Sequence, residues 1–156
     1  MMFEGGCSCG AVRYRLTSEP MFTNCCHCLD CQRQTGSAFV INALYETDRI
    51  EVTKAAPKPW RMPTESGYPH DIYRCGQCGV ALWSDYGGRP YLRFVRVGTL
   101  DDPIAIKPDA HIFTRTKVPW VRLPEGAPAF EIFYDLDKQW SPEGLARRKA
   151  ASEQAQ

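Results

Sequence analysis

Eight cysteines dominate the chemistry that this sequence offers, because thiolates bind soft and borderline metal ions. They fall into three short clusters within residues 7–9, 25–31 and 75–78, and the second half of the 156-residue chain has none. Disulfide frameworks are typical of short secreted domains, in which bridges replace a large core. Clustered pairs in a chain of this length instead predict metal binding, since two thiolates on one tight turn can face a single ion.

The first and third clusters predict one closed site. Cys7-Ser8-Cys9 and Cys75-Gly76-Gln77-Cys78 are each followed by a glycine, which permits the positive φ that such a turn requires. Backbone N–H groups in the turn can then donate to the sulfur atoms. Four protein ligands mark a structural zinc, and redox-labile free thiols are the alternative interpretation. The predicted structural set is Cys7, Cys9, Cys75 and Cys78.

The middle cluster predicts a second, more open site. Cys26, Cys28 and Cys31 have a convergent spacing, whereas neighbours such as Cys25 and Cys26 point apart in an extended segment. Three protein ligands with one open position are the arrangement of a catalytic zinc. The alternative is a second structural zinc that Cys25 or His27 closes, and iron can replace zinc in a tetrahedral thiolate set.

Composition excludes several other classes of protein. Lysine and arginine total 19 against 18 aspartate and glutamate, a net charge of +1, which disfavours nucleic-acid binding. No apolar run approaches the roughly 18 residues of a membrane span. Residues 1–6 lack the basic and apolar regions of a signal peptide, and free thiols suit a reducing compartment. We therefore predict a cytoplasmic protein that binds neither nucleic acid nor membranes.

Short alternating runs predict a mainly β domain that positions these cysteines. A short helix is expected over residues 29–35, ending at Gly36, and another from Ser141-Pro142-Glu143 to about Lys149. We place a zinc domain at residues 1–140, and a short C-terminal helix with a frayed tail at residues 141–156. The expected strands cover residues 11–16, 38–45, 49–52, 72–73, 80–83, 91–97, 111–113 and 129–134.

Several segments resemble the glutathione-dependent formaldehyde-activating enzyme (GFA) family, also called the centromere protein V domain family. They are Gly5 to Tyr14, Cys26 to Phe39 and Cys75 to Gly79, and the later stretch from His111 to Trp120 is similar to a downstream motif of the family. The resemblance runs from about Gly5 to Phe133, which is nearly the whole chain.

The resemblance implies a β-tent, Mss4-like fold: small antiparallel sheets around two zinc sites, with short helices. It places the family's structural zinc on Cys7, Cys9, Cys75 and Cys78, and its labile zinc on Cys26, Cys28 and Cys31. It also implies a carbon–sulfur lyase that adds the thiol of glutathione to formaldehyde or a related small aldehyde. We therefore expect two Zn²⁺ per chain. A non-enzymatic, zinc-stabilised interaction module is the alternative function.

Four further residues are candidates for this chemistry. His27 and His111 are candidate general acids, because imidazole titrates near neutral pH. The alternatives are that His27 points away from the metal between two ligands, and that His111 is a hydrogen-bonded histidine at the start of a strand. Arg33 and Lys117 are candidates to bind the carboxylates of a thiol such as glutathione, and solvated surface charge is their ordinary interpretation. A methionine sulfoxide reductase is excluded, since no cysteine follows Cys78 to act as its nucleophile.

Overall fold

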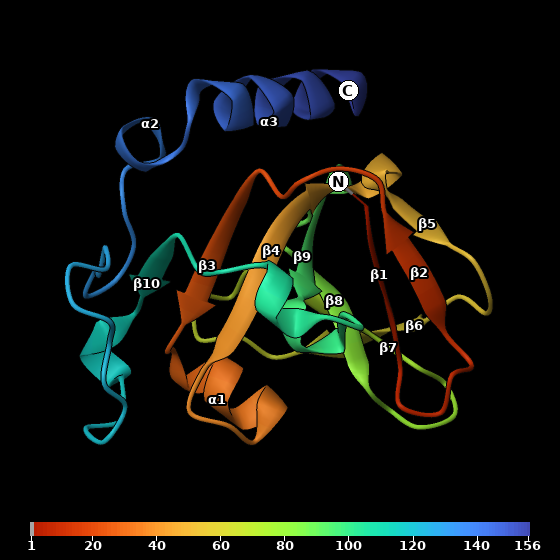
Figure 1. Ribbon diagram of the computed structural model, residues 1–156, viewed down its shortest axis with the longest axis horizontal. Coiled ribbons are helices and arrows are strands. Elements are labelled where there is room, and N and C mark those ends of the chain that lie inside the picture. Colours follow the sequence, from red (N-terminus) through yellow and green to blue (C-terminus); the bar gives the residue numbers. More distant parts are fainter. Residues whose placement is uncertain (1) are drawn as a thin grey trace.

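Two β-sheets form most of the computed structural model, which describes residues 2–156 (Figure 1). One is three-stranded, with the order β1-β2-β5, and the other is seven-stranded, with the order β10-β3-β4-β9-β8-β7-β6. Only the pairing of β10 with β3 is parallel among these strands. The predicted mainly β fold is therefore confirmed. The strands are β1 (Phe3–Gly6), β2 (Arg13–Leu16), β3 (Phe22–Cys26), β4 (Val40–Glu46), β5 (Ile50–Val52), β6 (Lys58–Met62), β7 (His70–Arg74), β8 (Ala81–Tyr86), β9 (Leu92–Arg96) and β10 (Ala110–Ile112).

Three α-helices accompany the sheets: α1 (Leu29–Thr35), α2 (Leu136–Gln139) and α3 (Pro142–Gln154). Single 3₁₀ turns are η1 (Thr47–Arg49), η2 (Val97–Thr99), η3 (Pro103–Ala105) and η4 (Thr114–Thr116). In Figure 1, α1 lies near one end of β3 and β4, and α3 lies near the other end. Within residues 2–156, no helix combines the length and apolar composition that a membrane span requires.

Both predicted helices form, but the second is longer than expected. The first ends at Gly36, which adopts a positive φ of 65° as its C-cap. The second begins at Ser141, whose hydroxyl accepts from the backbone N–H of Gly144. It continues to Gln154, so a frayed tail from residue 150 was wrong. The residues 150–154 have good helix propensity, and an ion pair of 3.8 Å joins Lys149 to Glu153 one turn later.

The strand pattern also needs correction. Residues 129–134 do not form a strand: Ala129 makes only an isolated bridge to His111. Three strands were not predicted. β1 contains two glycines, β3 carries the cysteine cluster, and β6 contains Pro59, which fits its position at the edge of the sheet.

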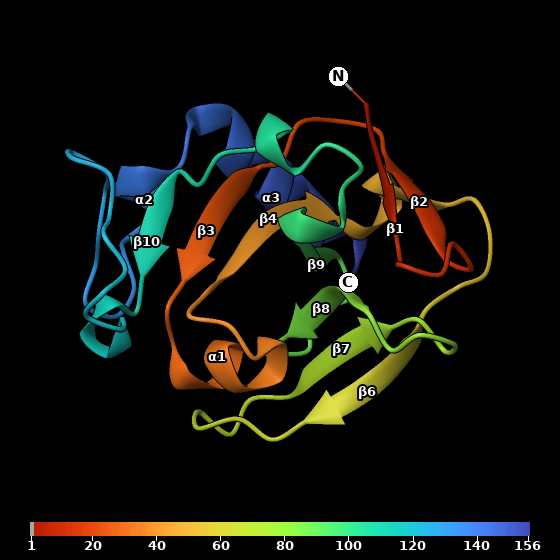
Figure 2. The ribbon, with the colours of Figure 1, turned by 60° about the horizontal axis from the view of Figure 1, so that its bottom comes forward.

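Side-chain alternation along β4 divides the core in two. Ala43 and Tyr45 pack against the cluster between the sheets, while Leu44 packs into a second cluster with Phe22 and Trp140. Figure 2 shows the three-stranded sheet beside the larger one, on the side away from β10. The second cluster therefore packs the C-terminal segment against the face of the seven-stranded sheet that carries Leu44.

Candidate functional site

The four cysteines of the first and third clusters converge, as the sequence predicts. The sulfur of Cys9 lies 3.5 Å from that of Cys7 and 3.7 Å from that of Cys75. A tetrahedral zinc with Zn–S bonds of about 2.3 Å places its sulfurs about 3.8 Å apart, so the spacing fits this ion. The full set, with all four sulfurs within 4.8 Å of one another, is Cys7, Cys9, Cys75 and Cys78.

Backbone geometry prepares this set for an ion. Gly10 and Gly79 have positive φ angles of 75° and 76°, and their N–H groups close the turns by donating to the carbonyls of Cys7 and Cys75. The N–H of Val12 donates to the sulfur of Cys7 at 3.2 Å. Such bonds stabilise thiolate charge and orient the ligands. A closed set of four thiolates with this support suits a structural metal ion.

The second set lies where β3 ends and α1 begins. Cys26 is the last residue of β3, Cys28 is the N-cap of α1, and Cys31 lies in its first turn. The sulfur of Cys28 accepts from the N–H of Cys31 at 3.3 Å, and the three sulfurs lie within 4.8 Å of one another. Hydrogen bonds from the Cys26 and Cys31 thiols hold the pKa of Cys28 well below its usual value. The set is thus anionic and suits a cation.

A buried arginine faces this anionic set. Arg96 is 5% exposed and donates to the side-chain oxygens of Asn42 and Gln34. The hydrogen bond with Cys26 and, to a smaller extent, the charge of Arg96 lower the pKa of Cys31, although the hydrogen bond with Cys28 and burial raise that pKa overall. Arg96 therefore partly balances the thiolate charge without serving as a ligand.

Cys25, His27 and His111 form a third group, on the opposite side of β3. Alternation turns Cys25 away from Cys26, and the parallel pairing with β10 places His111 beside Cys25. The Nε2 atom of His27 lies 3.6 Å from the sulfur of Cys25 and 3.1 Å from Nδ1 of His111. Burial raises the pKa of Cys25 to about 12 and lowers that of His27 to about 4. The group is therefore uncharged at neutral pH.

A cavity of about 590 Å³ adjoins the second cysteine set. Its floor is the face of the large sheet that carries Leu44. On this face Asn24, Asn42 and Arg96 form a polar row in register across β3, β4 and β9. The C-terminal segment supplies a further wall through Phe133, Leu136, Trp140 and Arg148. Cysteine thiols and a mostly apolar space thus share one site, which is typical of small-molecule binding.

The four further candidates from the sequence do not line this cavity; they are His27, His111, Arg33 and Lys117. His27 and His111 belong to the third group, and Lys117 donates to the carbonyls of Val121 and Val118 at 2.7 and 3.2 Å. Arg33 lines a neighbouring cavity of about 530 Å³ that also includes Met62. The sequence did not indicate the cavity residues from β9 and the C-terminal segment, because only long-range pairing brings them to the cysteines.

Replacing Cys25 with alanine is expected to leave the metal content of the protein unchanged. The thiol points away from the second cysteine set, so its loss removes packing and costs about 1 kcal/mol of stability. Elemental analysis and urea unfolding measure the two effects. Loss of one metal ion per chain would show instead that Cys25 completes the second site, which is the alternative that its position in the sequence left open.

Comparisons of sequence and fold find proteins that are similar to this chain. The family model for glutathione-dependent formaldehyde-activating enzymes matches residues 2–116. A Halomonas elongata protein named "Putative glutathione-dependent formaldehyde-activating enzyme" is 29% identical over 128 residues, or 79% of this chain and 82% of the relative. A crystal structure of a Rhodobacter sphaeroides protein has a TM-score of 0.50 and 21% identity, over 67% of this chain and 91% of that one. This last likeness concerns the fold alone.

The fold and site together define a mainly β protein with one closed cysteine set and one that borders a cavity, both suited to metal ions. The chain belongs to the glutathione-dependent formaldehyde-activating enzyme family, since the family model covers most of its length. The match ends at residue 116. The cavity wall formed by Phe133, Trp140 and Arg148 therefore lies outside the matched residues.

Proposed function

We propose that this protein binds two zinc ions per chain and is a carbon–sulfur lyase that joins the thiol of glutathione to formaldehyde. Membership of the family supports the two substrates. The observation that carries the proposal is the three-thiol set of Cys26, Cys28 and Cys31 at the edge of a cavity of about 590 Å³. Three protein ligands leave room for a substrate thiol as the fourth.

Zinc at this set would lower the pKa of a bound thiol, so that a thiolate forms near neutral pH. The reaction forms a bond between sulfur and the carbonyl carbon, while the S–H bond breaks and the carbonyl oxygen gains a proton. No electrons are transferred overall, and the product is S-hydroxymethylglutathione. The reverse reaction breaks the same carbon–sulfur bond.

The protein's own residues hold the site in place. The carbonyl of His27 accepts from Gln32 Nε2 and from the hydroxyl of Thr116, each at 2.9 Å. These bonds fix the turn that carries Cys26 and Cys28, and rigid support of this kind preserves ligand geometry. His27 and His111 act as structural residues in this proposal, because both lie on the opposite side of β3 from the cavity.

Metal stoichiometry and lability test the proposal. Freshly purified protein is expected to contain close to two zinc ions per chain, one of which a mild chelator removes selectively. Glutathione should slow that removal several-fold, since a bound thiol completes the coordination of the labile ion. Exchange NMR with glutathione and formaldehyde should show faster formation of the adduct than in buffer alone.

The opposite results would reject this mechanism. One zinc per chain, or two equally inert ions that are indifferent to glutathione, would remove the open coordination position on which the reaction depends. The zinc-stabilised interaction module would then be the favoured function. A rate of adduct formation equal to that in buffer would lead to the same conclusion.

A further inference from the structure

The cavity is larger than the reacting atoms require. Its volume of about 590 Å³ lies within the range that encloses drug-sized ligands, whereas formaldehyde has only two non-hydrogen atoms. Between the cysteines and the C-terminal wall, Leu44, Leu92 and Phe94 provide an apolar surface. The space beyond the cysteines therefore needs an occupant with an extended body, and the charges around it indicate which kind.

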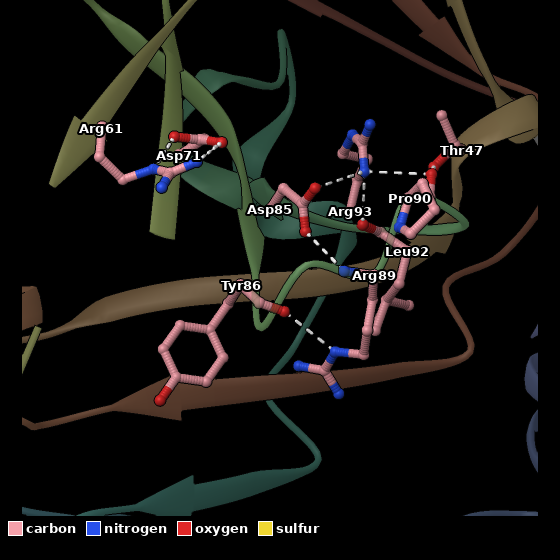
Figure 3. Close-up of polar contacts among 9 residues, drawn as sticks. All are labelled: Thr47, Arg61, Asp71, Asp85, Tyr86, Arg89, Pro90, Leu92 and Arg93. Atoms are coloured by element: carbon pink, nitrogen blue, oxygen red, sulfur yellow. Dashed lines mark hydrogen bonds and ion pairs between the residues drawn. The ribbon is translucent and has the colours of Figure 1, made fainter. Parts of the chain in front are cut away.

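Two arginines that are next in sequence to lining residues of the cavity have partners. Arg93 forms a 3.5 Å ion pair with Asp85, as Figure 3 shows. Arg147 on α3 binds both carboxylate oxygens of Glu46 at 2.7 Å, which fastens the helix to the end of β4. The guanidinium groups of these residues are thus engaged in the structure.

Arg89 is different. Its Nε donates to the carbonyl of Tyr86 at 3.0 Å, and the guanidinium lies over the ring of Phe94 with 5.7 Å to the centroid. Asp85 accepts from the backbone N–H of Arg89, not from its side chain (Figure 3). Within residues 2–156, the two terminal nitrogens of Arg89 have no protein acceptor, although the residue is half-buried.

Arg148 is a second half-buried arginine without a side-chain partner in the same cavity, whose lining also includes the exposed Arg115. It lies on α3 next to the well-paired Arg147, yet within the described chain its side chain forms no ion pair or hydrogen bond. Its charge acts on Arg89: burial lowers the pKa of Arg89 most, and the charge of Arg148 lowers it further. Asp30 and Glu65 also line the cavity, and Asp85 accepts from the backbone of Arg89. None of these acids forms an ion pair with Arg89 or Arg148. Two half-buried like charges without an ion-pair partner are unfavourable alone and favourable around an anion.

We propose that Arg89 and Arg148 form an anion-binding subsite for a carboxylate of the substrate whose sulfur lies at Cys26, Cys28 and Cys31. The apolar surface of Leu92, Phe94 and Trp140 contacts the body of the ligand between its two polar ends. The inference rests on the proposed function and extends it, because it assigns substrate selectivity to a C-terminal segment beyond the family match. The carboxylate belongs either to the thiol or to the aldehyde.

Binding measurements on the zinc-loaded full chain distinguish the two sources. Calorimetry compares glutathione with its diethyl ester, and 2-mercaptoethanol plus glyoxylate with 2-mercaptoethanol plus formaldehyde. We expect Arg89→Gln and Arg148→Gln each to weaken the binding of the carboxylate-bearing ligand about tenfold. The affinity for the matching ligand without a carboxylate should change less than twofold. Arg122→Gln, which removes an exposed arginine outside the cavity, is the control and should change neither.

Each outcome has a distinct meaning. A selective effect on glutathione places the carboxylate on the thiol, and a selective effect on the glyoxylate mixture places it on the aldehyde. Equal losses of affinity for ligands with and without a carboxylate would overturn the subsite while leaving the proposed function intact. No loss of affinity with either variant would do the same. Wild-type protein that binds none of these thiols would reject both. Arg148→Gln serves alone if Arg89→Gln does not fold, because Arg148 lies on the surface helix α3.

Discussion

Replacing Cys75 with serine is expected to unfold the protein or to lower its melting temperature by more than about 15 °C. Cys75 and Cys9 are 66 residues apart, and their sulfurs lie 3.7 Å from each other, so a metal ion here connects distant parts of the chain. Structural zinc contributes on the order of 10 kcal/mol to the free energy of folding. The net free energy of unfolding of a whole domain is only about 5–15 kcal/mol. Circular dichroism with thermal unfolding measures the effect.

Metal removal provides the matching experiment on the wild-type protein. A strong chelator that extracts both ions should cause the same loss of structure as the Cys75 substitution, and added zinc should restore the fold. The control is Cys25→Ala, which removes a buried thiol outside this set. A Cys75→Ser variant that melted within a few degrees of the wild type would show that the four-cysteine set does not stabilise the fold.

Replacing Cys31 with serine is expected to remove one of the two proposed zinc ions and to reduce the proposed thiol addition by about 100-fold or more. The residue is one of three candidate ligands at the cavity. A metal ion that stabilises a developing charge lowers the activation barrier by several kcal/mol. The fold should persist, because the four-cysteine set is untouched. Elemental analysis, exchange NMR and circular dichroism measure the three quantities.

Cys25→Ala is again the matched control, because this cysteine is also buried and adjacent to the cluster but lies on the other side of β3. It should retain both ions and full activity. If Cys31→Ser kept its activity after losing the second ion, the reaction would not occur at this site. If it lost both ions together, the two sets would not be independent.

Local spacing made much of the site predictable. A pair of cysteines separated by one or two residues brings its sulfurs together in almost any tight turn, and Gly10 and Gly79 supply the required positive φ. The same local logic placed α1, because its N-cap and Gly36 are both encoded within nine residues. Alternation along an extended segment separated Cys25 from Cys26, and the structure places them in different groups.

Local reasoning was less successful where pairing partners are distant. Residues 129–134 have a strand-like composition, but their backbone hydrogen bonds to residues 111–115 are irregular and only Ala129 forms a β-bridge. Phe130 and Tyr134 pack into the second core cluster. β6 was missed because Pro59 weakens a strand signal, whereas the edge of a sheet tolerates it. Composition describes what a segment can form, and the neighbours available to it decide what it does form.

The sequence alone therefore determined the two thiolate sets, the family, helix α1 and the start of α3, since each depends on residues close together in the chain. Only the tertiary structure decided which partners the remaining polar side chains have. It joined His27 to His111 across 84 residues and engaged Lys117 with backbone carbonyls. It also brought Arg148 into one cavity with Arg89. Sheet register and helix docking produce these contacts over long sequence separations, where no local pattern records them.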